Sequence, residues 1–346
     1  MIGGGQLGRM LALAGIPLGL SFRFVDPSPD APAREVGELL VGAYDDPELL
    51  DRLADGTDVV TYEFENVPVE AARRVGALPG PAALEQGQDR LVEKQLFRRL
   101  GIPTAPFGDE VTEFPALLKT RRLGYDGKGQ RLVESRPQPT AATDVAGTVP
   151  ATWVDNEHVL EGLVPFDREL SLLAVRGRDG DTRFWPLVEN VHAGGILRSS
   201  RAPAGDAPQA LAEDYATRLL DELGYVGVLA LELFQVGDEL LANEFAPRVH
   251  NTGHWTIEGA ATSQFENHLR AVLGLPLGPT HARGANVMVN VIGAVPPLDA
   301  LLALPGAHVH LYGKEPRPGR KLGHVTLVGP DAATVERLEE LVAKSH

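Results

Sequence analysis

The most regular alternation of apolar and polar residues lies between positions 229 and 251 and predicts a β-hairpin. Successive side chains of a strand point to opposite faces of the sheet. Leu229, Leu231 and Leu233 therefore share one face of the first strand, and Glu232 lies on the other. The pair Gly237–Asp238 is typical of the tight turn that joins two such strands.

The second strand of this hairpin carries another carboxylate near its end. Strict alternation puts Leu240, Ala242 and Glu244 on one face and Asn243 on the opposite face. An acidic side chain inside an apolar hairpin is costly to bury unless it is paired or binds a cation. The simpler alternative is that both glutamates face solvent on an edge hairpin, and the hairpin alone does not decide between these interpretations.

The first 85 residues alternate between strand-like and helical patterns. We expect strands at 1–2, 21–25 and 58–63, and a helix at 6–19 whose apolar residues recur at helical spacing. Alternation of this kind is typical of a doubly wound parallel sheet with helices on its faces.

The remainder of the chain mixes three helices with many short strands. The helices are predicted at 89–100, 208–223 and 256–273, and clean alternation after residue 285 predicts further strands. We therefore expect an α/β protein whose later part is α+β. Its predicted units are an N-terminal doubly wound domain at 1–85, a central subdomain with a glycine-rich loop at 86–160, a unit of mixed strands and helices at 161–275 and a small β-rich piece at 276–346.

Composition and charge narrow the classes of function. The chain of 346 residues has 32 basic and 47 acidic side chains, a net charge of −15, and no cysteine. The acidic excess disfavours nucleic acid and anionic membranes as partners, and the lack of cysteine excludes disulfides and sulfur-ligated metals. The apolar start lacks a basic leader and is too short to span a bilayer, so we expect a cytoplasmic enzyme with small-molecule substrates.

The polar residues that follow the hairpin suggest a site that holds a metal ion together with an anion. Arg248, His250 and Asn251 come directly after the two carboxylates, Glu232 and Glu244. Magnesium takes oxygen ligands, usually one or two carboxylates plus substrate phosphates. The hairpin therefore predicts a metal–nucleotide site.

A glycine-rich turn at the start of the chain could bind a phosphate. Gly3, Gly5 and Gly8 fit the dinucleotide-binding pattern G-x-G-x-x-G, and Asp26 stands where a ribose-binding acid would. The pattern is weak, because the same glycines suit any tight turn that presents N–H groups to a phosphate at a helix start. A nicotinamide-dependent oxidoreductase built on this turn is one alternative for the whole protein, and a non-catalytic nucleotide-binding protein is another.

A second glycine-rich loop, GYDGKGQ at 124–130, follows Lys119. Its backbone N–H groups could close over a triphosphate as a flap, and Lys119 could add a charge from the strand beneath. Alone, such a loop is more simply the tip of a hairpin. Glu161 and Glu169 follow in a strand–linker–strand segment that would lie under an adenine and its ribose.

A flap, a hinge strand and two terminal carboxylates in this order resemble the ATP-grasp superfamily. Six segments resemble one of its families, the ligases that carboxylate 5-aminoimidazole ribonucleotide in purine biosynthesis, and together they span the chain. These segments are GGGQLGRM (3–10), TYEFENVP (61–68), QDRLVEKQLF (88–97), GYDGKGQ (124–130), NEFAPRVHNTGHWT (243–256) and RPGRKLGHV (317–325).

The resemblance implies an ATP site, a metal site and a substrate site, and it places central and catalytic ATP-grasp domains after residue 85. The residues expected to contact ATP are Arg90, Lys119, Gly124, Tyr125, Asp126, Gly127, Lys128, Gly129, Gln130, Glu161, Gly162, Leu163, Val164, Glu169, His192, Asn243 and Glu244. Glu232 and Glu244 are expected to hold Mg²⁺ or Mn²⁺. The catalytic candidates are Asp126, Lys128, Arg248, His250 and Asn251.

Aminoimidazole ribonucleotide and bicarbonate are the expected small substrates beside ATP. The residues implied for the ribonucleotide are Gly5, Gln6, Leu7, Arg248, His250, Asn251, Arg320 and Lys321, with the N-terminal turn near its phosphate. Such an enzyme activates bicarbonate as carboxyphosphate and releases ADP and phosphate, and His250 or Asp126 could take the proton of the attacking amine. The resemblance also implies a homodimer. A sister enzyme, such as the formate-dependent glycinamide ribonucleotide transformylase, is the nearest alternative.

Three departures from the family pattern affect the expected fold. The first strand is nearly missing, the stretch 107–118 is short enough to lack a helix, and Leu123 stands where a glycine is common before the flap. A missing strand would destabilise the N-terminal turn, and Leu123 would stiffen the flap.

Overall fold

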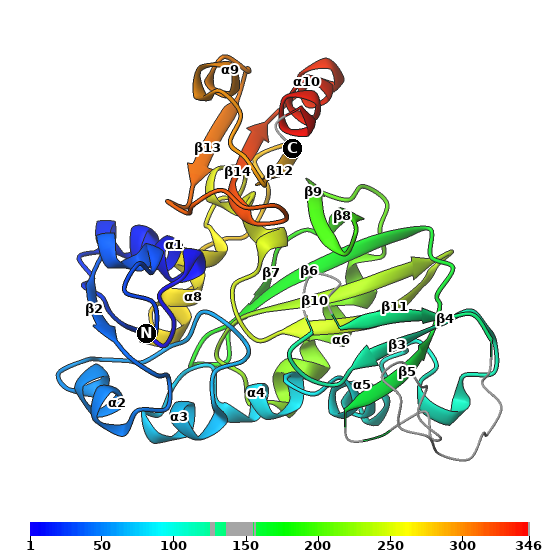
Figure 1. The fold of residues 1–346 in the computed structure, drawn as a ribbon, viewed down its shortest axis with the longest axis horizontal. Helices are drawn as coiled ribbons and strands as arrows, with labels where there is room; N and C mark the ends of the chain where they lie inside the picture. Colours follow the sequence, from blue (N-terminus) through cyan, green and yellow to red (C-terminus); the bar gives the residue numbers. More distant parts are fainter. Residues whose placement is uncertain (125–128, 136–154, 156, 345–346) are drawn as a thin grey trace.

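The computed structural model describes residues 1–124, 129–135, 155 and 157–344 (Figure 1). Tyr125, Asp126, Gly127 and Lys128, as well as the connection at 137–150, lie outside the described residues. The N-terminal part lies beside a large sheet, and the C-terminal helices stand at one end of the molecule. No helix in the described part of the chain combines the length and apolar character that crossing a membrane requires.

The N-terminal part contains the expected parallel sheet in a reduced form. Strand β1 (Arg23–Asp26) pairs in parallel with β2 (Glu38–Val41), and Ile2 forms parallel bridges to Val25 and Tyr62. The predicted strand at 58–63 is thus present only as a bridge at Tyr62. The helical elements here are α1 (Gln6–Gly15), η1 (Ile16–Leu18), η2 (Pro32–Glu35), α2 (Pro47–Ala54), α3 (Val69–Arg74) and α4 (Pro81–Gly87).

A three-stranded antiparallel sheet follows helix α5 (Arg90–Arg99) and the short η3 (Gly108–Glu110). Its strands are β3 (Ala116–Thr120), β4 (Gln130–Val133) and β5 (His158–Gly162), in the order β4-β3-β5. Helix α5 matches the predicted helix at 89–100 and begins where the Asp89 carboxylate accepts a hydrogen bond from Leu91 N–H.

The remaining strands form one nine-stranded sheet in the order β11-β10-β6-β8-β9-β12-β14-β13, with β7 paired to β6. Its first strands and helix are β6 (Arg168–Arg176), β7 (Thr182–Phe184), β8 (Val188–Ala193), β9 (Ile196–Ala202), α6 (Gln209–Glu222), β10 (Gly227–Val236) and β11 (Glu239–Ala246). Then come η4 (Asn251–Gly253), α7 (Thr256–Gly259), α8 (Gln264–Leu273), β12 (Asn286–Ile292), α9 (Leu298–Leu302), β13 (Ala307–Leu311), β14 (Lys321–Val328) and α10 (Ala332–Ala343).

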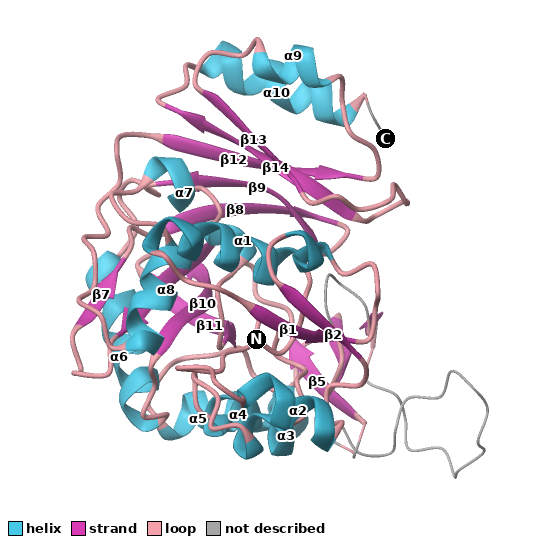
Figure 2. Ribbon diagram, turned by 90° about the vertical axis from the view of Figure 1, so that its left-hand side faces the viewer, coloured by secondary structure: helices cyan, strands magenta, loops and turns pink. Residues whose placement is uncertain are grey.

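The C-terminal strands extend the sheet that also contains β10 and β11, because β12 pairs with β9 (Figure 2). The prediction of a single helix at 256–273 is wrong. This stretch forms two helices, α7 and α8, because Ser263 caps a new helix by accepting a hydrogen bond from Glu266 N–H.

The strand β10 is covered on both faces where it enters the sheet. Leu229, Leu231 and Leu233 pack into a core with residues of α5 and α6, as their alternation predicts. Val228 and Ala230 on the other face pack with residues of α1 and α8. Further along this second face, Glu232 takes the next alternate position.

Candidate active site

The two carboxylates of the hairpin lie on one face of the sheet, but for a reason that alternation did not predict. Glu232 pairs directly with Glu244, whereas the next residue, Leu233, pairs with Ala242. Asn243 is therefore an extra residue, a β-bulge, in β11. The prediction that Glu244 shares a face with Leu240 and Ala242 is wrong, because the bulge reverses the alternation beyond Asn243.

Each carboxylate has one basic partner across the cleft. Glu232 Oε1 lies 3.1 Å from His250 Nε2, and Glu244 Oε2 accepts a hydrogen bond of 2.9 Å from Arg90 Nη1. Although burial opposes the charged form of Glu232, His250 and more distant cations lower the pKa of this carboxyl below its usual value. A negative charge is therefore held at the sheet face.

Two of the three candidate residues after the hairpin, Arg248 and His250, line this cleft. The Arg248 guanidinium forms an ion pair with the Glu65 carboxylate. Burial alone would raise the pKa of Glu65, but Arg248 lowers it to about 2. His250 Nδ1 lies 2.9 Å from the Thr252 hydroxyl, so Nε2 faces Glu232.

The polar atoms of the Asn251 side chain are buried and unsatisfied within the described structure. Neither its Nδ2 nor its Oδ1 has a hydrogen-bond partner in the described part of the chain. Buried polar groups in proteins are almost always paired. Asn251 is therefore suited to contact a bound molecule.

The predicted ATP residues Lys119 and Glu161 form a buried ion pair. Lys119 Nζ lies 2.8 Å from Glu161 Oε2, and Lys94 Nζ lies 3.4 Å from the same oxygen. Burial opposes the charge of Glu161, but the two lysines lower its pKa to about 2. Two lysine side chains thus share one carboxylate near the predicted phosphate position.

The hinge at 161–164 leaves the central sheet beside this ion pair. Gly162 N–H donates to the Pro106 carbonyl, and Leu163 is 45% exposed, so its side chain is available to a ligand. Beyond the hinge, Glu169 Oε2 lies 2.5 Å from His192 Nδ1. Burial opposes protonation of His192, but Glu169 outweighs it and raises the pKa of this imidazole.

The glycine turn at the N-terminus is already occupied by carboxylates of the protein. Gly8 N–H donates 2.7 Å to Glu63 Oε2, Gly5 N–H donates to Glu63 Oε1, and Gly4 N–H donates 2.8 Å to Asp26 Oδ2. Tyr44 and Ser28 also donate to Asp26. Asp26 is therefore a structural acceptor rather than a free ribose ligand, which removes the basis of the nicotinamide alternative.

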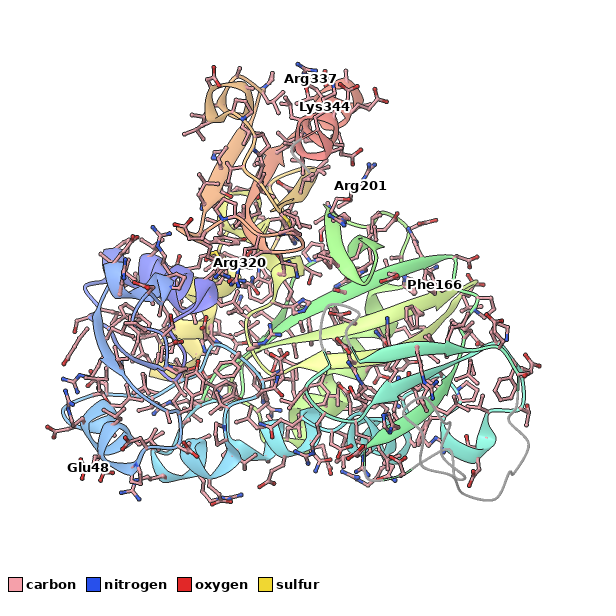
Figure 3. All side chains as sticks on the ribbon, viewed as in Figure 1. Glu48, Phe166, Arg201, Arg320, Arg337 and Lys344 are labelled. Carbon is pink, nitrogen blue, oxygen red and sulfur yellow. The ribbon has the colours of Figure 1, made fainter. Side chains whose placement is uncertain are left out.

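The neighbouring residues of this turn meet the C-terminal part of the chain. The Gln6 side chain accepts a hydrogen bond from Lys314 Nζ, and Leu7 packs partly buried against the core. Arg320 (labelled in Figure 3) directly precedes β14, and its Nη1 donates a hydrogen bond of 3.1 Å to the Glu315 carbonyl. Lys321 begins β14 and lies near enough to His192 to oppose the protonation of that imidazole.

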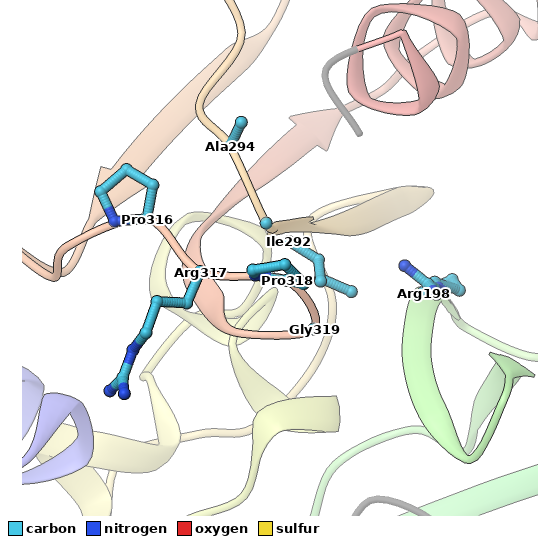
Figure 4. Close-up of a pocket in the computed structure, with 8 residues that line it drawn as sticks. Arg198, Ile292, Ala294, Pro316, Arg317, Pro318 and Gly319 are labelled. Carbon is cyan, nitrogen blue, oxygen red and sulfur yellow. The ribbon is translucent and has the colours of Figure 1, made fainter.

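A larger cavity of about 510 Å³ lies outside the carboxylate cleft, between β9, the end of β12 and the loop before β14 (Figure 4). Arg198, Ile292 and Pro318 line it, and the Arg317 side chain points away from Pro318. It shares no residue with the cleft around Arg90, Glu244 and His250.

Of the predicted flap at 124–130, the described residues are those at its two ends. Leu123 has a φ of 61° and is 72% exposed. This left-handed conformation is unfavourable for a branched side chain and explains why a glycine suits the position. Gly124 accepts a hydrogen bond from Arg90 Nη2, Gly129 has a φ of 74°, and Gln130 begins β4.

The donor atoms around Glu232 and Glu244 fit Mg²⁺. Among the described residues, no group of three or more His, Cys, Asp or Glu residues could enclose a metal ion. Magnesium does not require such an enclosure, because one or two carboxylates and substrate phosphates usually suffice. Two carboxylates paired on one sheet face meet this requirement.

Sequence reasoning missed three charged residues in this region. Glu65 orients Arg248, while Glu93 and Lys94 are 2% and 1% exposed on α5. Burial and the nearby Glu244 raise the pKa of Glu93 well above its usual value. Helical periodicity could have indicated that Glu93 and Lys94 are buried, because they occupy the helix face that also carries the buried Phe97.

Known proteins resemble the chain over its whole length. Three family models match it: the ribonucleotide synthetase preATP-grasp domain at residues 1–88, the ATP-grasp domain at 104–265 and the phosphoribosylaminoimidazole carboxylase C-terminal domain at 286–338. The N5-carboxyaminoimidazole ribonucleotide synthase of Pseudomonas aeruginosa is 52% identical, and the match covers 99% of this chain and 98% of that protein.

Solved structures agree with these matches. The N5-carboxyaminoimidazole ribonucleotide synthetase of Thermus thermophilus is 56% identical, with a TM-score of 0.90 and coverage of 99% of this chain and 98% of that one. The synthase of Aspergillus clavatus, solved in complex with ADP and 5-aminoimidazole ribonucleotide, is 29% identical, with a TM-score of 0.85 and coverage of 99% and 97%.

Proposed function

This chain belongs to the N5-carboxyaminoimidazole ribonucleotide synthase family, and from that membership we propose a role for each group of the site. The protein is an ATP-grasp ligase. It uses ATP and bicarbonate to convert 5-aminoimidazole ribonucleotide to the N5-carboxy product, with release of ADP and phosphate, in purine biosynthesis. The family match favours this reaction over that of the formate-dependent transformylase.

We propose that Glu232 and Glu244 hold Mg²⁺, or Mn²⁺ in its place, with the ATP phosphates as further ligands. Their direct pairing on one sheet face is the observation that carries this proposal. A bound divalent ion would neutralise charge on the phosphates that react. Arg90 and His250, which now contact the two carboxylates, would turn toward the nucleotide and substrate.

For the nucleotide, Lys119 is the proposed cation at the phosphates, because Lys94 already balances Glu161. The hinge at 161–164 would receive the adenine, and Glu169 with His192 would lie nearby. Phosphoryl transfer needs chiefly positioning and charge neutralisation, which these groups supply. The glycine loop 124–130 would close over the phosphates and protect carboxyphosphate from water.

For the ribonucleotide, Asn251, Arg248 and His250 are the proposed contacts, and Arg320 and Lys321 would bind its phosphate. Support comes from the unsatisfied Asn251 amide and from the position of Arg248 and His250 in the cleft that also contains Glu244. The proposed base is His250 Nε2, which lies 3.1 Å from Glu232 Oε1 and would accept a proton from the attacking amine. Asp126 is the alternative base. Because the Gly5 and Gly8 amides are engaged by Glu63, the N-terminal turn would contact the substrate through Gln6 and Leu7.

The decisive assay measures phosphate release from ATP by the purified chain. Release should require bicarbonate and rise when 5-aminoimidazole ribonucleotide is added. Formate with glycinamide ribonucleotide serves as the control pair and should not stimulate release. Stimulation by the control pair alone would reject the assigned reaction.

Two broader features complete the proposal. We expect a homodimer in the cytoplasm, where ATP and the ribonucleotide are available, with domain boundaries near residues 85, 160 and 275. Light scattering coupled to gel filtration measures the oligomeric state, and a monomer at assay concentration would contradict the first expectation.

A further inference from the structure

Glu93 and Lys94, which are neighbours on helix α5, hold the backbone of β11 on both sides of Glu244. Glu93 Oε1 accepts a hydrogen bond of 2.6 Å from Phe245 N–H. Lys94 Nζ donates a hydrogen bond of 2.8 Å to the Asn243 carbonyl oxygen. Both contacts join residues about 150 positions apart in the chain, with separations of 152 and 149.

These two hydrogen bonds restrain the two peptide units that flank Glu244. The Asn243 carbonyl belongs to the planar unit before the Glu244 Cα, and the Phe245 N–H belongs to the unit after it. Fixing both planes fixes φ and ψ of Glu244, and therefore the direction in which its side chain leaves the strand. Both hydrogen bonds act at the bulge, where the regular hydrogen-bond ladder to β10 is interrupted.

Lys94 is fully engaged in this arrangement. Its ammonium also donates 3.1 Å to Thr104 Oγ1 and lies 3.4 Å from Glu161 Oε2, so three neighbouring oxygens match its three N–H groups. Thr104 in turn donates 2.7 Å to the Ala242 carbonyl. The same lysine thus ties the bulge to the carboxylate beside Lys119.

Buried ionisable side chains are weak evidence for stability, because well-packed apolar residues often serve as well. The face of α5 that carries Glu93 and Lys94 otherwise presents Phe97 and Leu96 to the core. Apolar residues could therefore fill these positions if packing were the only requirement. Glu93 and Lys94 make specific hydrogen bonds to the backbone that apolar side chains cannot make.

We propose that Glu93 and Lys94 are positioning residues that orient Glu244 for the metal. This inference rests on the proposed function of Glu244 as a ligand of Mg²⁺. Groups behind a metal ligand typically change metal affinity about 10- to 100-fold when they are removed.

The test compares four variants of the full chain in the phosphate-release assay. Glu93→Met keeps the length of the side chain but removes the acceptor, whereas Glu93→Gln keeps an acceptor for Phe245 N–H. Gln95→Met changes an exposed residue of the same helix, and Glu244→Gln removes the proposed ligand charge. Each variant is titrated with Mg²⁺ and with Mn²⁺ at saturating ATP, bicarbonate and aminoimidazole ribonucleotide.

The metal concentration for half-maximal activity should rise about 10- to 100-fold in Glu93→Met and stay near wild type in Glu93→Gln and Gln95→Met. The KM for aminoimidazole ribonucleotide should not change in Glu93→Met. A folded Glu93→Met with a wild-type metal requirement would overturn the proposal, as would a Glu93→Gln variant as impaired as Glu93→Met.

Two further experiments distinguish failure of this inference from failure of the proposed function of Glu244. If Glu93→Met does not fold, Thr104→Val replaces it, since it removes one oxygen that holds Lys94; a smaller rise in metal requirement supports the inference, and no rise overturns it. If Glu244→Gln retains normal metal dependence, the proposed function of Glu244 itself fails. If Glu244→Gln loses metal dependence while Glu93→Met does not, only the positioning role fails.

Discussion

Glu232 and Glu244 face each other across the β10–β11 ladder because Asn243 is an extra residue in β11. Without this bulge, alternation would turn Glu244 toward the core that Leu240 and Ala242 occupy. The bulge therefore creates the paired carboxylates on which the proposed metal site depends.

Glu244→Gln should lower turnover at least about a hundredfold, the size typical of losing one preorganised charge contact. The substitution keeps the shape of the side chain but removes the charge that faces Arg90 and Glu232. Steady-state phosphate release measures the effect. Glu239→Gln, an exposed position at the start of the same strand, should behave like wild type. Equal turnover in both variants would exclude Glu244 from the chemistry.

Asn251→Ala should raise the KM for aminoimidazole ribonucleotide about tenfold, while the free energy of unfolding falls by less than about 1 kcal/mol. The variant removes a buried amide that has no protein partner in the described structure, so little folding energy is lost. Asn267→Ala is the matched control, because that amide exchanges two hydrogen bonds with Gly278. The control should lose stability and keep its KM; the reverse pattern would contradict the assignment.

Glu63→Gln should reduce the free energy of unfolding by about 1–3 kcal/mol, the cost of leaving a buried donor without an acceptor. Both carboxylate oxygens of Glu63 accept backbone N–H groups, from Gly5 and Gly8. An amide would present its NH₂ group to one of them. Urea unfolding measures the loss, with the exposed Glu70→Gln as control. No difference between the two variants would show that the turn does not depend on this carboxylate.

Stability should fall as the pH drops below about 6.5 because His268 is buried in its neutral form. Burial lowers the pKa of His268 from 6.5 to about 4 in the folded protein. The unfolded chain therefore binds a proton first, so the stabilisation is complete above about 6.5 and is lost as the pH falls toward about 4. At about 1.4 kcal/mol per pKa unit, the loss is on the order of 3 kcal/mol.

The hydrogen bonds of His268 explain why protonation is unfavourable. Nδ1 accepts from Val228 N–H, so Nε2 carries the proton that it shares with the Thr61 hydroxyl. Thermal unfolding between pH 5 and 8 should show a shallower pH dependence in His268→Gln than in wild type. The exposed His281→Gln should retain the wild-type slope. Parallel slopes in all three proteins would refute this explanation.

Local patterns predicted most of the elements that surround the site. Helix α5, helix α6 and the hairpin β10–β11 appear where periodicity and turn residues indicated. The failures have local causes that periodicity does not report, since Ser263 starts a new helix inside an apolar pattern and Tyr62 retains only one bridge of an expected strand.

The sequence by itself determined the chemistry of this protein: two hairpin carboxylates, the Arg248–Asn251 cluster, the glycine-rich loops and the family to which their order belongs. Only the tertiary structure decided which of these groups are free to contact a ligand and which are engaged by the protein itself. It places Glu63 on the amides of the N-terminal turn, Lys94 against Glu161, and Glu93 on the strand that carries Glu244. The physical reason is that these contacts join residues 55 to 152 positions apart or depend on one bulge. Periodicity describes a strand or helix in isolation and contains no information about such partners.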